Sequence, residues 1–218
     1  MSPAPTPGRF AVVDLYRGVA IVGVVIYHFS WDLGFYGFTA TDVAADPAWR
    51  GFARLLAGSF LALSGIGLVL AHRGGLRWNA FLRRLAALAI TVATFFAFPD
   101  QFIYFGILHA IALFSVLALP FLRLPPPLVV AVGALILLAP LLVTVDAFGH
   151  TRWLAWIGLV GSAPPTNDYV PFFPWFGVVL LGVAAARLVL ASPLAPRLAA
   201  WRPTMAPARA MMRVGRWT

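Results

Sequence analysis

Long apolar runs, separated by short polar segments, dominate the pattern along the chain. The runs do not alternate between apolar and polar residues as a half-buried strand would, and an open sheet edge cannot exist in lipid. Their length suits helices that cross a bilayer, because about 20 residues at a rise of 1.5 Å span the ~30 Å hydrocarbon core. The pattern predicts six transmembrane helices, over residues 10–29, 51–72, 80–98, 102–122, 128–145 and 171–190.

The segments between these helices predict how they connect. Residues 99–101 are short enough for a tight antiparallel hairpin, whereas polar loops are predicted at residues 30–50 and 146–170. Pro140 predicts a kink in the fifth helix, because proline removes a backbone donor. Small residues at helical spacing on the second helix predict close packing against a neighbouring helix: Gly58, Ala62 and Gly65.

Composition supports a membrane protein and leaves no room for a soluble domain. Of the 218 residues, 61% are hydrophobic and 11% are charged, and the mean hydropathy is +0.89. Soluble domains carry charge on about a quarter of their residues. The sequence therefore predicts an all-α polytopic transmembrane helix bundle, with residues 1–218 as a single integral membrane domain. The absence of Cys excludes disulfides and thiol chemistry, and we expect the first apolar stretch to be a retained helix.

The charge distribution predicts the orientation of this bundle. The net charge is +9, and all 16 basic residues are arginines. With the amino terminus inside, three of them lie outside (Arg50, Arg54 and Arg152) and the remaining thirteen lie at or near the cytoplasmic ends. This positive-inside bias predicts that both termini are cytoplasmic, N-in and C-in. Clustering in loops also argues against a nucleic-acid partner, whose binding surface would carry a basic stripe.

The first predicted helix carries ionisable residues at both ends of a short apolar core. Residues 18–27 cover only about 15 Å, so a spanning helix must take Arg17 or His28, or both, toward the membrane interior. Eleven residues at 100° each come to about 20° past three turns, which places these two side chains on one face. Asp32 falls near that face if the helix continues. The alternative is that Asp14 and Arg17 form an interfacial i, i+3 pair and His28 lies at headgroup level.

Three further residues are candidates for chemistry. His109, in the fourth predicted helix, lies at a depth similar to that of His28, so the two could line a shared site; alternatively His109 is a packing residue. Arg83 and Arg84 open the third predicted helix, where they anchor it at the interface or bind phosphates of a cytoplasmic donor. Two histidines without a third ligand give no reason to expect a metal.

Four segments together resemble a known family. The chain resembles the multi-pass membrane acyltransferases, and more closely the bacterial relatives of the heparan-α-glucosaminide N-acetyltransferase catalytic domain. In this order the segments are fairly specific and cover most of the chain. They are Asp14-Leu-Tyr-Arg-Gly-Val-Ala-Ile through Tyr27-His28-Phe, Phe60-Leu-Ala-Leu-Ser-Gly65, Phe105-Gly-Ile-Leu-His109 and Phe173-Pro-Trp-Phe-Gly-Val-Val-Leu-Leu-Gly182.

The resemblance implies an enzyme of the bacterial inner membrane. Such a protein transfers an acyl group, typically acetyl, from cytoplasmic acyl-CoA (acetyl-CoA) to an amine or hydroxyl of a carbohydrate acceptor on the far side. It places His28 as the catalytic residue, acting as general base or forming an acyl-histidine, and Arg17 on the donor side. On this hypothesis Asp32 orients the imidazole and His109 assists acceptor binding or proton handling. Arg83 and Arg84, together with Arg17, attract the CoA phosphates.

Two other classes of function stay open on the sequence. A proton-linked transporter would use His28 and His109 as relay groups, although no internal repeat supports it. A non-catalytic membrane subunit would use the same polar residues only to specify helix packing. Family members usually continue past a Gly-Arg segment into a further helix, whereas this sequence stops at Thr218, so it is truncated or lacks that helix.

Overall fold

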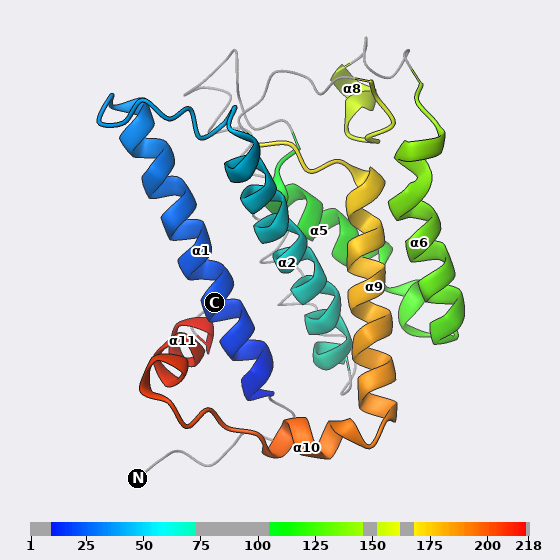
Figure 1. Ribbon diagram of the computed structural model, residues 1–218. Helices are drawn as coiled ribbons and strands as arrows, with labels where there is room; N and C mark the ends of the chain where they lie inside the picture. The colour runs from blue at the N-terminus through cyan, green and yellow to red at the C-terminus, as the bar shows by residue number, and fades with distance from the viewer. Residues whose placement is uncertain (1–9, 73–104, 146–151, 162–167, 217–218) are drawn as a thin grey trace. The chain divides into compact units, whose positions relative to one another are not determined.

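The computed structural model describes residues 10–72, 105–145, 152–161 and 168–216, whose helices are drawn in Figure 1. Regular structure within these ranges is helical, apart from an isolated bridge between Phe105 and Tyr169. The helices are α1 (Ala11–Phe35), α2 (Pro47–Ala71), α5 (Ile107–Leu117), the 3-10 helix η3 (Pro120–Leu122), α6 (Pro126–Leu142), α8 (Arg152–Ala155), α9 (Phe172–Ala191), α10 (Leu194–Ala200) and α11 (Ala206–Arg216). The all-α prediction is confirmed for this part of the chain.

In the part of the chain that the structure describes, three helices are long and apolar enough to cross a membrane: α1, α2 and α9. They correspond to the first, second and sixth predicted spans. Both α1 and α2 extend into the predicted loop between them, which is therefore shorter than expected. The start of α2 has a local cause, because the Asp46 carboxylate accepts hydrogen bonds from the backbone N–H groups of Ala48 and Trp49. Pro47 follows at the first helical position, where its missing N–H costs nothing.

The fourth predicted span, residues 102–122, is wrong in its bounds. The helix α5 has 11 residues, about 16 Å at helical rise, and η3 follows it after a break. The fifth predicted span corresponds to α6, which has 17 residues and begins inside the triple proline rather than after it. Proline at the start of a helix has a suitable fixed φ, so the run begins α6. Pro140 lies inside α6, two residues before its end.

Several topological predictions stay untested. The third predicted span, residues 80–98, and the hairpin at 99–101 lie outside the described residues. The span count of six and the cytoplasmic location of both termini therefore remain predictions. The segment after residue 190, for which no helix was predicted, contains α10 and α11.

The chain divides into two compact units. The first unit consists of Met1–Leu63 and Val189–Thr218. In it α11 lies against the N-terminal half of α1 (Figure 1). The two backbones approach closely, because a methyl group added to Gly18 would overlap the carbonyl of Met211, and one added to Gly215 would overlap the carbonyl of Asp14. Glycine is required at this crossing on steric grounds.

The second unit, Ser64–Leu188, is built around α9. A methyl group on Gly65 of α2 would overlap the Val179 carbonyl of α9, which confirms the predicted close packing at this position. Gly133 of α6 and Gly177 of α9 make a similar approach. Aromatic rings fill the space beside α5, with Phe114 fully buried. Its ring lies 5.9 Å from that of Phe172 and 5.4 Å from that of Phe176, centroid to centroid.

Candidate functional site

The helix α1 carries most of the candidate chemistry. It is continuous from Ala11 to Phe35, so Arg17 and His28 share one face and lie about 16 Å apart along the axis. The helix also includes Asp32, one turn beyond His28. Asp32 was predicted to lie near this face if the helix continued that far, and α1 does continue past Asp32. One rigid element fixes the spacing between a cation at its N-terminal end and an imidazole near its C-terminal end.

At the N-terminal end of α1, the buried carboxylate of Asp14 lies close to two arginines. Asp14 is 3% exposed. Its Oδ1 lies 3.8 Å from Nη1 of Arg17, and its Oδ2 lies 3.5 Å from Nε of Arg216 in α11. Nη1 of Arg17 also donates a hydrogen bond to the Gly215 carbonyl at 3.2 Å. The predicted i, i+3 pair is confirmed, and a second arginine from the other end of the chain joins it.

Sequence reasoning missed Arg216 as a partner of this site. The residue was counted only as one of the arginines of the tail. The available sequence signal was the amphipathic pattern of the last residues, where Met211 and Met212 lie between arginines at helical spacing. Such a pattern predicts a helix with one apolar face, but it does not say which helix it packs against.

Near the C-terminal end of α1, the imidazole of His28 is exposed. The Tyr27 ring contacts it edge-on, with centroids 5.7 Å apart and planes at 85°, and also lies 6.1 Å from the Trp49 ring of α2. Asp32 is exposed as well. Within the described residues no hydrogen bond joins the Asp32 carboxylate to the His28 ring. The orienting role of Asp32 remains a prediction.

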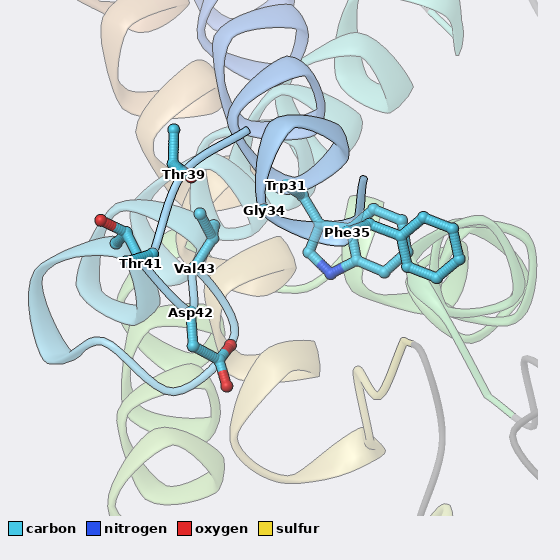
Figure 2. A pocket seen from close by; sticks show the side chains of 8 residues that line it. Trp31, Gly34, Phe35, Thr39, Thr41, Asp42 and Val43 are labelled. Carbon is cyan, nitrogen blue, oxygen red and sulfur yellow. The ribbon is translucent and has the colours of Figure 1, made fainter. Parts of the chain in front are cut away.

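A pocket of about 300 Å³ opens one turn beyond His28, between the end of α1 and the loop that follows it (Figure 2). Two aromatic rings of α1, Trp31 and Phe35, stack with centroids 5.1 Å apart and planes at 13°. Figure 2 shows these rings on one side and the loop side chains on the other. The lining residues are Trp31, Gly34, Phe35, Thr39, Ala40, Thr41, Asp42 and Val43.

Local contacts hold the loop side of this pocket in place. The Asp42 carboxylate accepts hydrogen bonds from the backbone N–H groups of Ala44 and Ala45, at 3.0 and 3.1 Å. Val43 is buried beneath the loop, and Gly34 brings α1 close to the Thr41 carbonyl. Sequence analysis missed the pocket because α1 was expected to end at residue 29. A small, partly open space lined by rings, hydroxyls and a carboxylate suits a polar ligand with an apolar face.

His109 belongs to the second unit and lies near the start of α5. It is buried, and its Nδ1 accepts a hydrogen bond from the Gly106 N–H at 3.3 Å. Asp168, which the sequence did not single out, accepts a hydrogen bond from the Ile107 N–H at 2.7 Å. These two side chains satisfy backbone donors that an α-helix leaves open at its N-terminus. The geometry thus gives His109 a structural role, as the packing alternative allowed, and its predicted role in acceptor or proton handling is untested.

Arg83 and Arg84 lie outside the described residues, so their predicted contact with the donor is untested. Across the described ranges, no group of three His, Asp or Glu side chains is placed to hold a metal ion.

The apolar helices and the charged face of α1 define the class of protein. The chain is an integral membrane protein of helical architecture, with ionisable side chains held along one long apolar helix. The family model for the catalytic region of heparan-alpha-glucosaminide N-acetyltransferase matches residues 9–218. The chain belongs to that family, which suggests a membrane acyltransferase-like function, and the resemblance noted in the sequence is confirmed. No curated protein and no solved structure gives a significant match.

Proposed function

We propose that this protein is a membrane acyltransferase that moves an acetyl group from cytoplasmic acetyl-CoA to an amine or hydroxyl of a carbohydrate on the far side of a bacterial inner membrane. The observation that carries the proposal is the family match over residues 9–218, which includes the whole of α1 with Arg17 and His28 on one face. The donor end is the N-terminal end of α1, and the chemistry takes place near its C-terminal end.

His28 acts as the general base. As the acceptor nitrogen or oxygen attacks the thioester carbonyl, the imidazole takes the proton from the acceptor. The C–S bond breaks, CoA leaves as thiolate, and the proton passes from the imidazole to that thiolate. In the alternative route His28 itself attacks the thioester carbonyl, CoA leaves, and the acyl group then passes from the imidazole to the acceptor. The overall reaction is the same. Asp32, one turn away on α1, orients the imidazole in either route.

The spacing on α1 suits a long donor. Arg17 binds the phosphates of CoA, because guanidinium groups pair well with phosphate oxygens. The thioester must then reach His28, about 16 Å further along the helix. The pantetheine arm of CoA is a flexible chain long enough to run along α1 over this distance. A separate phosphate site and reaction centre on one rigid helix fit this substrate.

The pocket at the end of α1 is the acceptor subsite. A sugar ring has an apolar face of C–H groups that stacks on the electron-rich face of an aromatic ring, and Trp31 and Phe35 offer such faces. Its hydroxyls then meet Thr39, Thr41 and Asp42 on the other side. The volume of about 300 Å³ lies at the lower end of the range for small-molecule sites and suits one sugar ring.

The test is acetyl transfer by the purified full-length protein in lipid nanodiscs, with labelled acetyl-CoA and a panel of amino sugars and neutral sugars. We expect His28→Ala to bind acetyl-CoA as the wild type does and to lose transfer by at least a hundredfold, the usual worth of general-base catalysis. His72→Ala is the matched control, since among the described residues that ring bonds the Leu68 carbonyl within α2. Undiminished transfer by His28→Ala would refute the assignment, and a wild type that neither binds nor transfers would refute the function.

A further inference from the structure

The last two described helices expose arginines beside large apolar side chains. We propose that α10 and α11 form a surface that binds anionic phospholipids of the surrounding membrane. The guanidinium groups of Arg197, Arg209 and Arg213 bind the lipid phosphates, and the side chains of Trp201 and Met205 enter the apolar layer beside them. This inference goes beyond the proposed acyl transfer and does not depend on it.

The segment begins where a membrane-spanning helix ends. The helix α9 is long and apolar enough to cross a membrane and ends at Ala191, and α10 begins at Leu194. Two intervening residues cover at most about 7 Å, so α10 starts at the membrane surface. Both α10 and α11 also contact α1, another helix of spanning length (Figure 1).

The charge of this segment has one sign. Residues 192–216 include five arginines and no Asp or Glu. Arg216 is paired with Asp14 and has no part in the proposal. Arg197, Arg209 and Arg213 are exposed, and within the described ranges their guanidinium groups make no hydrogen bond or ion pair. Clusters of arginines directly after a transmembrane helix are complementary to anionic lipid headgroups.

Two of these arginines lie one helical turn from an exposed apolar side chain. The Trp201 N–H donates to the Arg197 carbonyl, and the Arg209 N–H donates to the Met205 carbonyl. Trp201 is 39% exposed and Met205 is 69% exposed. A soluble phosphate would leave these side chains in water, whereas a lipid offers a phosphate and an acyl chain side by side. Arginines beside Trp and other large apolar residues are typical of helices that lie in the membrane interface.

Packing on α1 determines which side of α11 stays exposed. The buried residues of α11 are Met212 and Gly215, and Gly215 approaches the Asp14 carbonyl of α1. Arg209 and Arg213 are four residues apart, so they lie within about 40° of each other around the helix. Their side of α11 remains exposed after this contact. Because α1 holds the helix that carries the pair, less conformational freedom is lost when lipid binds.

The experiment uses a single fluorescent label on α11. The chain has no Cys, so Ala210→Cys gives one attachment point for an environment-sensitive fluorophore at an exposed position. Full-length labelled protein is placed in nanodiscs of neutral phosphatidylcholine with increasing fractions of phosphatidylglycerol. The spectral shift of the label gives the fraction of phosphatidylglycerol at half saturation.

We expect the label to respond to phosphatidylglycerol and the arginine pair to be required. Each arginine near an anionic surface contributes about fivefold to binding. The double variant Arg209→Gln/Arg213→Gln should therefore raise the half-saturating fraction roughly thirtyfold or abolish the response, and Arg197→Gln should raise it about fivefold. Arg209→Lys/Arg213→Lys keeps the charge and should respond like the wild type. Trp201→Ala should weaken the response about tenfold, whereas Trp201→Phe should retain it.

Arg50→Gln/Arg54→Gln is the matched control, because these are exposed arginines with the same four-residue spacing on α2. It should leave the response unchanged, and a loss equal to that of Arg209→Gln/Arg213→Gln would mean that the label follows only the overall charge. An unchanged response of Arg209→Gln/Arg213→Gln would also overturn the proposal. So would an equal response, in neutral nanodiscs, to glycerophosphoglycerol or to polyglutamate, since these would assign the surface to a soluble anion or to an acidic protein.

Discussion

Replacing Gly18 by Ala tests whether the crossing of α1 and α11 is as tight as the structure has it. The added methyl group would overlap the Met211 carbonyl and would lie 3.2 Å from the Gly215 backbone nitrogen. Both obstacles are backbone, so no side-chain rotation relieves them and the two helices must separate. Overpacking of this kind costs about 1–3 kcal/mol. That cost corresponds to a shift of roughly 5- to 150-fold in the equilibrium between docked and undocked α11.

Trypsin offers a direct assay of this equilibrium. It cleaves after Arg209 and Arg213, which lie inside α11, and a docked helix resists cleavage. We expect Gly18→Ala to be cut in α11 faster than the wild type by a factor within that range. Gly51→Ala is the control, because a methyl group at that position in α2 meets nothing within 4 Å. Equal cleavage rates for Gly18→Ala and the wild type would refute the close crossing and, with it, the fixed position of Arg216.

Three further substitutions test other parts of the molecule. Trp31→Ala removes one ring of the pocket, so we expect the KM for an acceptor sugar such as glucosamine to rise about tenfold, with the KM for acetyl-CoA unchanged; equal effects on both would contradict the acceptor subsite. Phe114→Ala leaves a cavity where a fully buried ring contacts Phe172 and Phe176, and thermal unfolding in detergent should show a loss of about 3 kcal/mol. Asp46→Ala removes the cap of α2 and should cost about 1 kcal/mol in the same measurement, whereas Asp46→Asn should retain most of the stability.

The sequence predicted best what depends on neighbouring residues. The long apolar runs of α1, α2 and α9 predict helices, because the length of an apolar run is enough to indicate a membrane-spanning helix. The shared face of Arg17 and His28 follows from the helical period once α1 is continuous. The start of α2 was also readable, since Asp46-Pro47 is a usual beginning for a helix, although the predicted loop ran past it.

The errors have two physical origins. The apolar run from 102 to 122 does not indicate where α5 begins. The backbone N–H groups at the start of α5 are satisfied by the side chains of His109 and Asp168, and Asp168 is 61 positions away from Ile107 in the sequence. The end of α1 was placed too early because polar residues were read as a loop. Polar side chains near a helix end can remain in the helix when they face water or headgroups, and Asp32 does so.

The docking of α11 on α1 could not be predicted from either segment alone. The two glycines at the crossing, Gly18 and Gly215, are 197 positions apart, and each by itself is an ordinary small residue in a helix. Only their juxtaposition explains why the Asp14 carboxylate is buried, since a buried charge needs partners and Arg216 supplies the second one. A lone carboxylate at the start of an apolar helix was therefore the best available sign that another charged element packs there. The carboxylate of Asp14 thus predicts a cationic partner for the N-terminal end of α1, but not which arginine provides it.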